Sequence, residues 1–186
     1  LDEVMKKKRK TAFKIIRKEF VRYIKRLFEG GSGDMKEIYG EKPEDETEEE
    51  MEENVEEDKI EAKEVKKKVE KVLLGIDIAI NPPGKKIKHI NTLSGGERTL
   101  ASIALICAVL SYNPAPFVVL DEVEAALDEV NTRRFAKILA ELSKKSQFII
   151  ITHNRVTMHS ADALYGVTMG GDGISQLLSV KLSEVG

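Results

Sequence analysis

The sequence predicts an α/β fold, and three segments of its second half carry that prediction. Two apolar runs, Phe117–Leu120 and Phe148–Ile151, have the length and composition of buried strands. The stretch between them, at 130–142, has the spacing of an amphipathic helix. A strand, a helix and a strand in this order favour a right-handed parallel crossover.

Further elements are predicted on both sides of this core. A helix over about residues 3–28 opens the chain, and the glycine-containing turn 29–33 ends it. Near the other end, apolar runs at about 164–169 and 174–182 flank Gly170-Gly-Asp-Gly173, which is typical of a β-hairpin. The opening helix has a basic face and an apolar face, and the apolar face comprises Phe13, Ile16, Phe20, Ile24 and Leu27.

The segment between helix and core is strongly acidic. Twelve Asp or Glu and a single Lys lie in 41–58, with too few apolar groups to offset the entropy of ordering the chain. We therefore predict a mobile insertion there and at most a weakly amphipathic helix at 59–73. The chain becomes compact again at Leu74, and Gly75–Ile80 alternates as a strand does. The predicted organisation is a root helix with its turn, an acidic insertion and a compact lobe, at 1–33, 34–73 and 74–186.

Composition and charge exclude several classes of protein. Aromatic residues make up 5% of the chain and Trp is absent, which argues against an aromatic-rich binding surface. The single cysteine, Cys107, excludes an internal disulfide framework and is expected to be a small buried side chain. We find no signal peptide and no run near the roughly 18 apolar residues of a membrane span. The sequence thus predicts a cytoplasmic fragment of a longer protein, without a membrane partner.

Paired acids stand at the end of the first buried strand. Asp121 and Glu122 directly follow Leu120, and the carboxyl ends of strands are where open α/β sheets bind ligands. Asp121 is placed to hold Mg²⁺ directly or through water, because this ion prefers one or two carboxylates together with phosphate oxygens. Glu122 is placed to orient and deprotonate a water that attacks a γ-phosphate. Taken alone, such a pair of acids is more often a solvated strand end that starts a helix.

A serine and two glycines precede the helix that follows Leu93. Ser94, Gly95 and Gly96 offer exposed backbone N–H groups, a hydroxyl and the positive end of a helix dipole, which together predict an anion site. The same residues, with Glu97 three positions after Ser94, are also a capping box. As a lone pentapeptide the motif leaves both readings open.

The order of these parts along the chain favours function. The serine-glycine turn precedes the Asp-Glu strand, Asp128 follows shortly after it, and His153 ends the next strand. Parallel neighbours end at one sheet edge, so we expect His153 to lie near Glu122, where it can hydrogen-bond a γ-phosphate or an attacking water. His89 and His159, by contrast, have no second metal ligand at useful spacing and are expected to be surface residues.

This order resembles that of ATP-binding-cassette ATPases, namely signature loop, Walker B strand, D-loop and switch histidine. Within that superfamily the sequence is similar to the heads of bacterial-type SMC (structural maintenance of chromosomes) proteins across residues 74–182. The glycine turn Gly30-Gly31-Ser32 resembles the point where the coiled coil enters such a head. The matching motifs are Pro82-Pro-Gly-Lys-Lys86, Leu93-Ser-Gly-Gly-Glu-Arg98, Pro116-Phe117, Leu120-Asp-Glu-Val-Glu-Ala-Ala-Leu-Asp128, Asn131, Gln147-Phe-Ile149, Thr152-His153, Ala161-Asp162 and Tyr165-Gly-Val-Thr-Met169.

The resemblance implies roles for several residues of these motifs. Asp121 would be the Mg²⁺ ligand, Glu122 the catalytic base and His153 the switch residue. The signature residues Ser94, Gly95 and Gly96, followed by Glu97, would contact the γ-phosphate of ATP held by a second head. Asp128 would communicate across that dimer, and residues 3–28 would be the root of the coiled coil. The implied fold is the C-terminal half of an ABC-type P-loop head, with a mainly parallel sheet, flanking helices and a terminal hairpin.

The resemblance also implies partners for the chain, because one loop that the family needs for ATP binding is missing from it. The Walker A pattern does not occur, since Gly84-Lys85-Lys86 lacks the hydroxyl residue and the upstream glycine. In this family that loop belongs to an N-terminal lobe, so the fragment alone is expected to be inactive. Implied partners are that lobe, a second head in a homodimer, a kleisin subunit at about 164–182 and nucleoid DNA, bound without sequence preference. The basic face between Lys6 and Arg26 suits such phosphate contacts, although a solvated coiled-coil root explains it equally well.

Two rival functions remain at this stage. The first is a coiled-coil DNA-repair ATPase head, against which the motifs at 82–86 and 165–169 argue. The second is a head that has lost catalysis and serves as a platform for the kleisin. Against it argue the intact residues Ser94, Asp121, Glu122 and His153.

Overall fold

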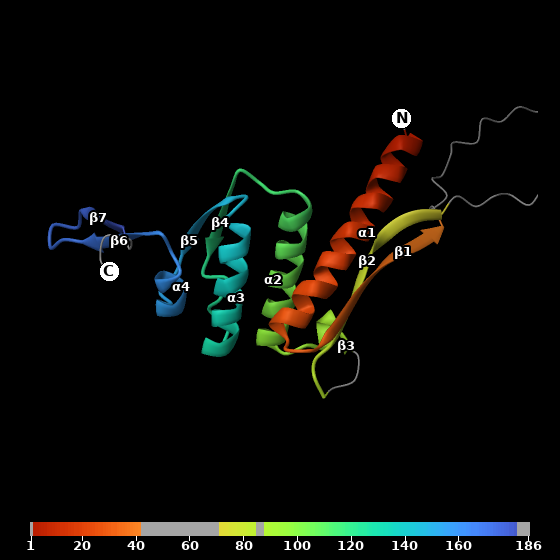
Figure 1. The fold of residues 1–186 in the computed structure, drawn as a ribbon, viewed down its shortest axis with the longest axis horizontal. Coiled ribbons are helices and arrows are strands. Elements are labelled where there is room, and N and C mark those ends of the chain that lie inside the picture. Colours follow the sequence, from red (N-terminus) through yellow and green to blue (C-terminus); the bar gives the residue numbers. More distant parts are fainter. Residues whose placement is uncertain (1, 42–70, 85–87, 182–186) are drawn as a thin grey trace, which may run out of the picture. The chain divides into compact units, whose positions relative to one another are not determined.

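The computed structural model describes residues 2–41, 71–84 and 88–181 (Figure 1). The chain divides into two compact units, one made of residues 1–34 and 78–186 and the other of residues 35–77. Most of the predicted acidic insertion lies outside the described residues, and this includes residues 42–58 of the acidic stretch and residues 59–70 of the predicted weak helix.

The opening helix is confirmed as α1, Asp2–Leu27. Its predicted apolar face is buried at Phe20, Ile24 and Leu27, and α1 packs against α2 (Figure 1). The sequence analysis missed Tyr23, whose ring is buried and whose hydroxyl lies 2.7 Å from Ser111 Oγ. Beyond the helix, Glu29 and Gly30 adopt positive φ values of 53° and 98°, which turn the chain as the glycines predicted.

A three-stranded sheet follows the turn. It contains β1 (Ser32–Glu41), β2 (Lys71–Asn81) and β3 (Lys88–His89) in that order, and β3 is antiparallel to β2. Residues 34–41 and 71–73 were predicted to belong to the flexible insertion, but both stretches are strand. Pairing between β1 and β2 satisfies the backbone groups of a segment whose polar side chains alone did not indicate a strand.

The core of the larger unit contains the predicted crossover. After the short 3₁₀ helix Ile90–Thr92 come α2 (Gly95–Tyr112), β4 (Phe117–Asp121), α3 (Glu129–Leu142) and β5 (Gln147–Ile151). Strands β4 and β5 are parallel and paired along their whole length, so Asp121 lies opposite Ile151. This register brings the ends of both strands to one edge of the sheet.

The two strands are only half buried, contrary to the prediction. Leu120 and Phe148 line a narrow apolar hollow together with side chains of α2 and α3, which cover one face of the sheet. Residues of the other face are exposed in this chain: Phe117, Val119, Ile149 and Ile151. Cys107 of α2 also lines the hollow, and burial raises the pKa of its thiol to about 12.

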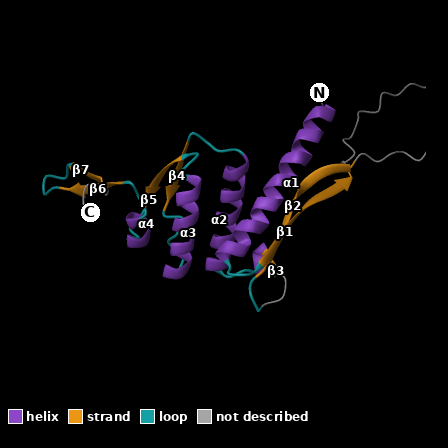
Figure 2. Cartoon of the chain, viewed as in Figure 1, coloured by secondary structure: helices purple, strands orange, loops and turns teal. Residues whose placement is uncertain are grey.

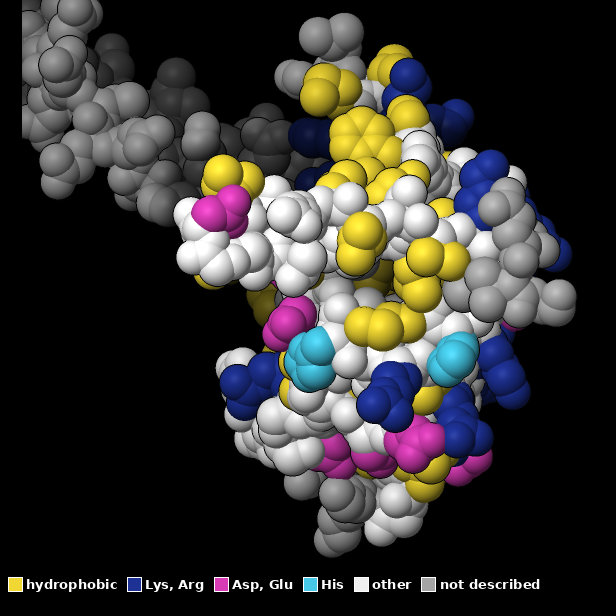
Figure 3. All heavy atoms as spheres, turned by 90° about the vertical axis from the view of Figure 1, so that its left-hand side faces the viewer, with side chains coloured by type: hydrophobic (Ala, Val, Ile, Leu, Met, Phe, Trp, Pro, Cys, Tyr) yellow, Lys and Arg dark blue, Asp and Glu magenta, His cyan; other side chains and the backbone are white. Residues whose placement is uncertain are grey.

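The chain ends in a hairpin, as predicted. The short helix α4 (Arg155–His159) contacts α3 and leads into β6 (Ala163–Met169) and β7 (Ser175–Lys181), which pair antiparallel (Figure 2). The Gly173 N–H donates to the Gly170 carbonyl at 3.0 Å to close the turn. Many apolar side chains of this hairpin are exposed, and the side from which Figure 3 is viewed carries several hydrophobic patches.

In the part of the chain that the structure covers, no helix has both the length and the apolar character needed to cross a bilayer. Within the same residues, no group of three or more His, Cys, Asp or Glu side chains is arranged to hold a metal ion by itself.

Candidate functional site

The paired acids lie where the chain leaves β4. Asp121 is the last residue of the strand and its side chain is exposed. Glu122 then adopts a left-handed conformation with φ of 44°, and its N–H donates to the Ile151 carbonyl at 2.9 Å. This turn ends the strand abruptly and presents the two carboxylates at the sheet edge. Such oxygen donors fit Mg²⁺, which needs only one or two carboxylates when phosphate and water complete its shell.

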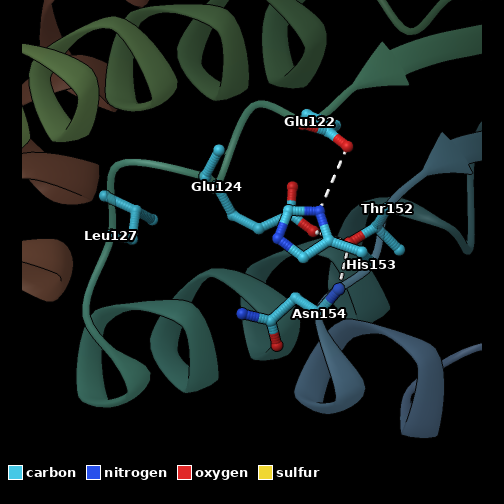
Figure 4. A pocket seen from close by; sticks show the side chains of 7 residues that line it. Glu122, Glu124, Leu127, Thr152, His153 and Asn154 are labelled. Carbon is cyan, nitrogen blue, oxygen red and sulfur yellow. Dashed lines mark hydrogen bonds and ion pairs between the residues drawn. The ribbon is translucent and has the colours of Figure 1, made fainter.

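His153 meets Glu122 from the neighbouring strand. Its Nδ1 lies 3.1 Å from Glu122 Oε1, although 77% of the histidine side chain and 51% of the glutamate side chain are exposed (Figure 4). The predicted proximity of these two residues is thereby confirmed. Because a carboxylate only accepts, Nδ1 carries the hydrogen of this bond and Nε2 stays available to a ligand.

A third acid, Glu124, lies behind this pair and was not singled out from the sequence. Only 2% of Glu124 is exposed, and its Oε1 accepts a 2.5 Å hydrogen bond from the Thr152 hydroxyl. A small pocket of about 50 Å³ is lined by Glu122, Ala125, Leu127, Thr152 and His153, together with Glu124 and Asn154. An acid in a loop ordinarily points into water, so the sequence held no signal of its burial.

The serine-glycine turn forms the start of α2. Ser94 is the N-cap: its Oγ accepts from Glu97 N–H at 3.4 Å, and Glu97 Oε2 accepts from Ser94 N–H at 3.0 Å. This confirms the capping box, which does not exclude an anion site at the same helix end. A side chain at Gly95 would meet open space, whereas a Cβ at Gly96 would lie 3.3 Å from the Ala126 carbonyl oxygen. The turn therefore touches the loop that follows β4.

Asp128 closes that loop by capping α3. Its Oδ1 accepts from Asn131 N–H at 2.8 Å, and the residue is exposed. The structure thus links Glu122 to His153 directly, and links Gly96 to the loop between Glu122 and Asp128. Among the described residues, Ser94 makes no hydrogen bond to Glu122 or His153.

Comparison with known proteins agrees with this arrangement of motifs. The model of the RecF/RecN/SMC N terminal domain family matches residues 14–176. The chain belongs to this family. A chromosome partition protein Smc of Bacillus subtilis (strain 168) is 56% identical over 110 residues, which are 59% of this chain and 9% of that protein. One of Myxococcus xanthus (strain DK1622) is 37% identical over 186 residues, which are 100% of this chain and 13% of that protein. The chain therefore spans only about a tenth of the length of these relatives.

Solved SMC heads have the same fold. The Smc head domain with a coiled coil and joint from Pyrococcus yayanosii has a TM-score of 0.72 and 33% identity, covering 98% of this chain and 30% of that one. The Smc head bound to the C-terminal domain of ScpA from Pyrococcus furiosus has a TM-score of 0.71 and 34% identity, covering 93% and 36%. This chain is an α/β fragment of an SMC head, and the motifs found in its sequence lie within the matched region.

Proposed function

We propose that this chain is the C-terminal half of an SMC ATPase head. Together with an N-terminal P-loop lobe and a second head it binds and hydrolyses ATP, and this cycle drives head engagement in chromosome condensation, organisation and segregation. The observation that carries the proposal is the contact between Glu122 and His153 at the edge of a parallel sheet. In the proposed reaction Glu122 is the base and His153 the hydrogen-bond donor, and their contact lets both act on the same water and γ-phosphate.

Each residue at this edge has a distinct task in the proposed reaction. Asp121 would hold Mg²⁺, which supplies charge to stabilise the phosphate oxygens. Glu122 accepts a proton from water as the oxygen of that water bonds to the γ-phosphorus, while the bond from this phosphorus to the bridging oxygen breaks and leaves ADP. His153 orients Glu122 through Nδ1 and directs Nε2 toward the γ-phosphate or the water.

The serine-glycine turn, Ser94–Gly96, here called the signature turn, completes the nucleotide site of the opposite head. The open space beside Gly95 and the exposed Ser94 suit the close approach of a γ-phosphate to backbone N–H groups at the start of α2. Glu97 holds the turn through the capping box, and Asp128 lies on the loop that touches Gly96. The chain thus contributes to two nucleotide sites in a homodimer, the catalytic half of one and the signature half of the other.

Exposed surfaces of the chain support the proposed partners. The bare apolar face of β4 and β5 suits packing against the P-loop lobe. We assign a kleisin subunit to the exposed hairpin of β6 and β7; among similar solved structures, one Smc head is bound to the C-terminal domain of ScpA and another to its C-winged helix domain. The basic face of α1 suits nonspecific contact with DNA phosphates. These partners imply a cytoplasmic protein associated with the nucleoid.

The test is the Glu122→Gln variant in the complete head, with this chain joined to its N-terminal lobe. Glutamine preserves the shape of the side chain but cannot accept the proton, so we expect hydrolysis to fall by at least about 10²-fold. ATP-dependent dimerisation, measured by light scattering, should persist. The exposed Glu129→Gln variant controls for the loss of one charge and should hydrolyse ATP normally. Equal turnover in Glu122→Gln and the wild type would remove Glu122 from the proposed role.

A further inference from the structure

Glu124 is buried although it carries a carboxylate. It is 2% exposed, and its only hydrogen-bond donor among the described side chains is Thr152, at 2.5 Å from Oε1. The second carboxylate oxygen, Oε2, is buried without a partner in the described part of the chain. Burying a carboxylate with one unpaired oxygen costs free energy. The bond to Thr152 offsets only part of this cost, which suggests a role for Glu124 other than stability.

The segment that Glu124 holds is the one that carries His153. The Thr152 hydroxyl donates to Glu124 and also accepts a hydrogen bond from the Asn154 N–H at 2.9 Å. The Thr152 oxygen therefore connects the backbone at Asn154, the residue after His153, to Glu124 in the loop after β4. On the near side, the Ile151 carbonyl accepts the Glu122 N–H at 2.9 Å. Residues on both sides of His153 are therefore tied to positions 122 and 124 (Figure 4).

His153 itself lacks packing that would hold it in place. Its side chain is 77% exposed, and the bond to Glu122 is the hydrogen bond that the structure records for its ring. The ring is therefore held by its bond to Glu122 and by the position of its backbone, because an exposed side chain with two torsions otherwise has many rotamers. Figure 4 shows the Glu124 side chain extending toward Thr152, and the ring of His153 facing Glu122.

We propose that Glu124 is a positioning residue, which uses the Thr152 hydroxyl to set His153 against the carboxylate of Glu122. The inference rests on the proposed hydrolysis of ATP and adds to it a residue that touches no nucleotide. The same loop contains the Ala126 carbonyl that faces Gly96, so the bond also joins the histidine segment to the loop that the signature turn contacts. A displacement of His153 by about 1 Å is enough to slow a positioned reaction by up to about 10².

The test compares variants of the full-length protein that contains this chain. Thr152→Val removes the hydroxyl and keeps the side-chain shape, and Glu124→Leu removes the acceptor. We expect each to lower kcat about tenfold or more, with the KM for ATP within about twofold of wild type, because nucleotide binding does not use this bond. Thr152→Ser and Glu124→Gln each keep the hydroxyl-to-oxygen bond and should restore kcat to within about threefold of wild type. Thr152→Val is the decisive variant if Glu124→Leu does not fold.

Two further readouts separate positioning from folding. ATP-dependent dimerisation should be unchanged in Thr152→Val, whereas a loss of folded protein would lower dimerisation and turnover together. The double variant Glu124→Leu with Thr152→Val should be no slower than the slower single variant, since both remove one bond. Wild-type kcat in Thr152→Val, or dimerisation that falls in step with turnover, would overturn the proposal. Glu122→Gln, measured in parallel, reports on the proposed hydrolysis itself: full turnover in that variant would overturn the catalytic assignment instead.

Discussion

Glu122, the proposed base, has an unusual backbone conformation. A left-handed conformation costs a residue other than glycine roughly 1–2 kcal/mol, and here φ is 44°. The hydrogen bond from Glu122 N–H to the Ile151 carbonyl offsets part of that cost. The conformation ends β4 at Asp121 and places the carboxylate of Glu122 within reach of His153. Strain of this kind is typical of functional sites, where geometry matters more than local stability.

Two adjacent glycines of the signature turn should respond differently to a methyl group. At Gly95 the added Cβ meets open space, so Gly95→Ala should leave the melting temperature unchanged or raise it, since alanine favours a helix by roughly 0.5–1 kcal/mol. It should nevertheless weaken ATP-dependent dimerisation, because the methyl group occupies the space that a phosphate would enter. Gly96→Ala should have a lower melting temperature than Gly95→Ala, because its Cβ would lie 3.3 Å from the Ala126 carbonyl oxygen and the loop after β4 would have to shift to accommodate it.

Calorimetry and light scattering on the complete head measure both effects. Wild-type dimerisation by Gly95→Ala would contradict the assignment of the turn to a second nucleotide site, whatever the melting temperature.

At the scale of elements, α1 is fixed to the rest of its unit by more than apolar packing. Arg26 donates two hydrogen bonds to Glu141 of α3, at 2.6 and 2.7 Å, and Arg134 of α3 bonds to the Leu27 carbonyl at 3.3 Å and pairs with Glu29. A helix that continues into a coiled coil would transmit movement through these contacts to α3, whose N-cap is Asp128.

The pair of Arg26 and Glu141 predicts a dependence of stability on pH. The hydrogen bond from Arg26 lowers the pKa of Glu141 in the folded protein. The contribution of this ion pair to the free energy of unfolding is therefore fully present above the pKa of Glu141 in the unfolded chain. It is lost as pH falls through the lower pKa of Glu141 in the folded protein. Both side chains are partly exposed, so we expect only about 0.5 kcal/mol. Urea unfolding of the complete head should show Glu141→Gln less stable than wild type at pH 7, and the difference should be smaller at pH 3, because protonation of Glu141 removes the ion pair. An undiminished difference at pH 3 would contradict this account.

The elements also show what the sequence could and could not predict. Periodicity located α1, α3 and the hairpin because each buries a face or turns at glycines, which are local properties. The pairing of Glu122 with His153 followed from the parallel order of β4 and β5. The strand at 34–41 and the burial of Glu124 depend on partners distant in sequence, namely β2 and Thr152, and no local pattern indicates them. The exposed face of β4 and β5 escaped prediction because apolar strands are usually covered on both sides.

At the scale of the whole molecule, we predict that one chain alone does not form a complete nucleotide site. In the part of the chain that the structure describes, Ser94 makes no hydrogen bond to Glu122 or His153, which suits the proposed dimer in which each nucleotide lies between Glu122 of one head and Ser94 of the other. Symmetric dimers place two such sites on either side of one axis. Loss of either half should then inactivate a homodimer, whereas heads with different defects should complement each other.

Mixing two inactive heads tests this claim most directly. Ser94→Arg blocks the signature half of the site and Glu122→Gln the catalytic half, so each complete head alone should hydrolyse ATP at background rates. An equimolar mixture should recover about a quarter of the wild-type rate, because roughly half of the dimers are mixed and each mixed dimer keeps one intact site. A mixture that stays as inactive as its components, or a Ser94→Arg head that is active alone, would contradict a nucleotide shared between two molecules.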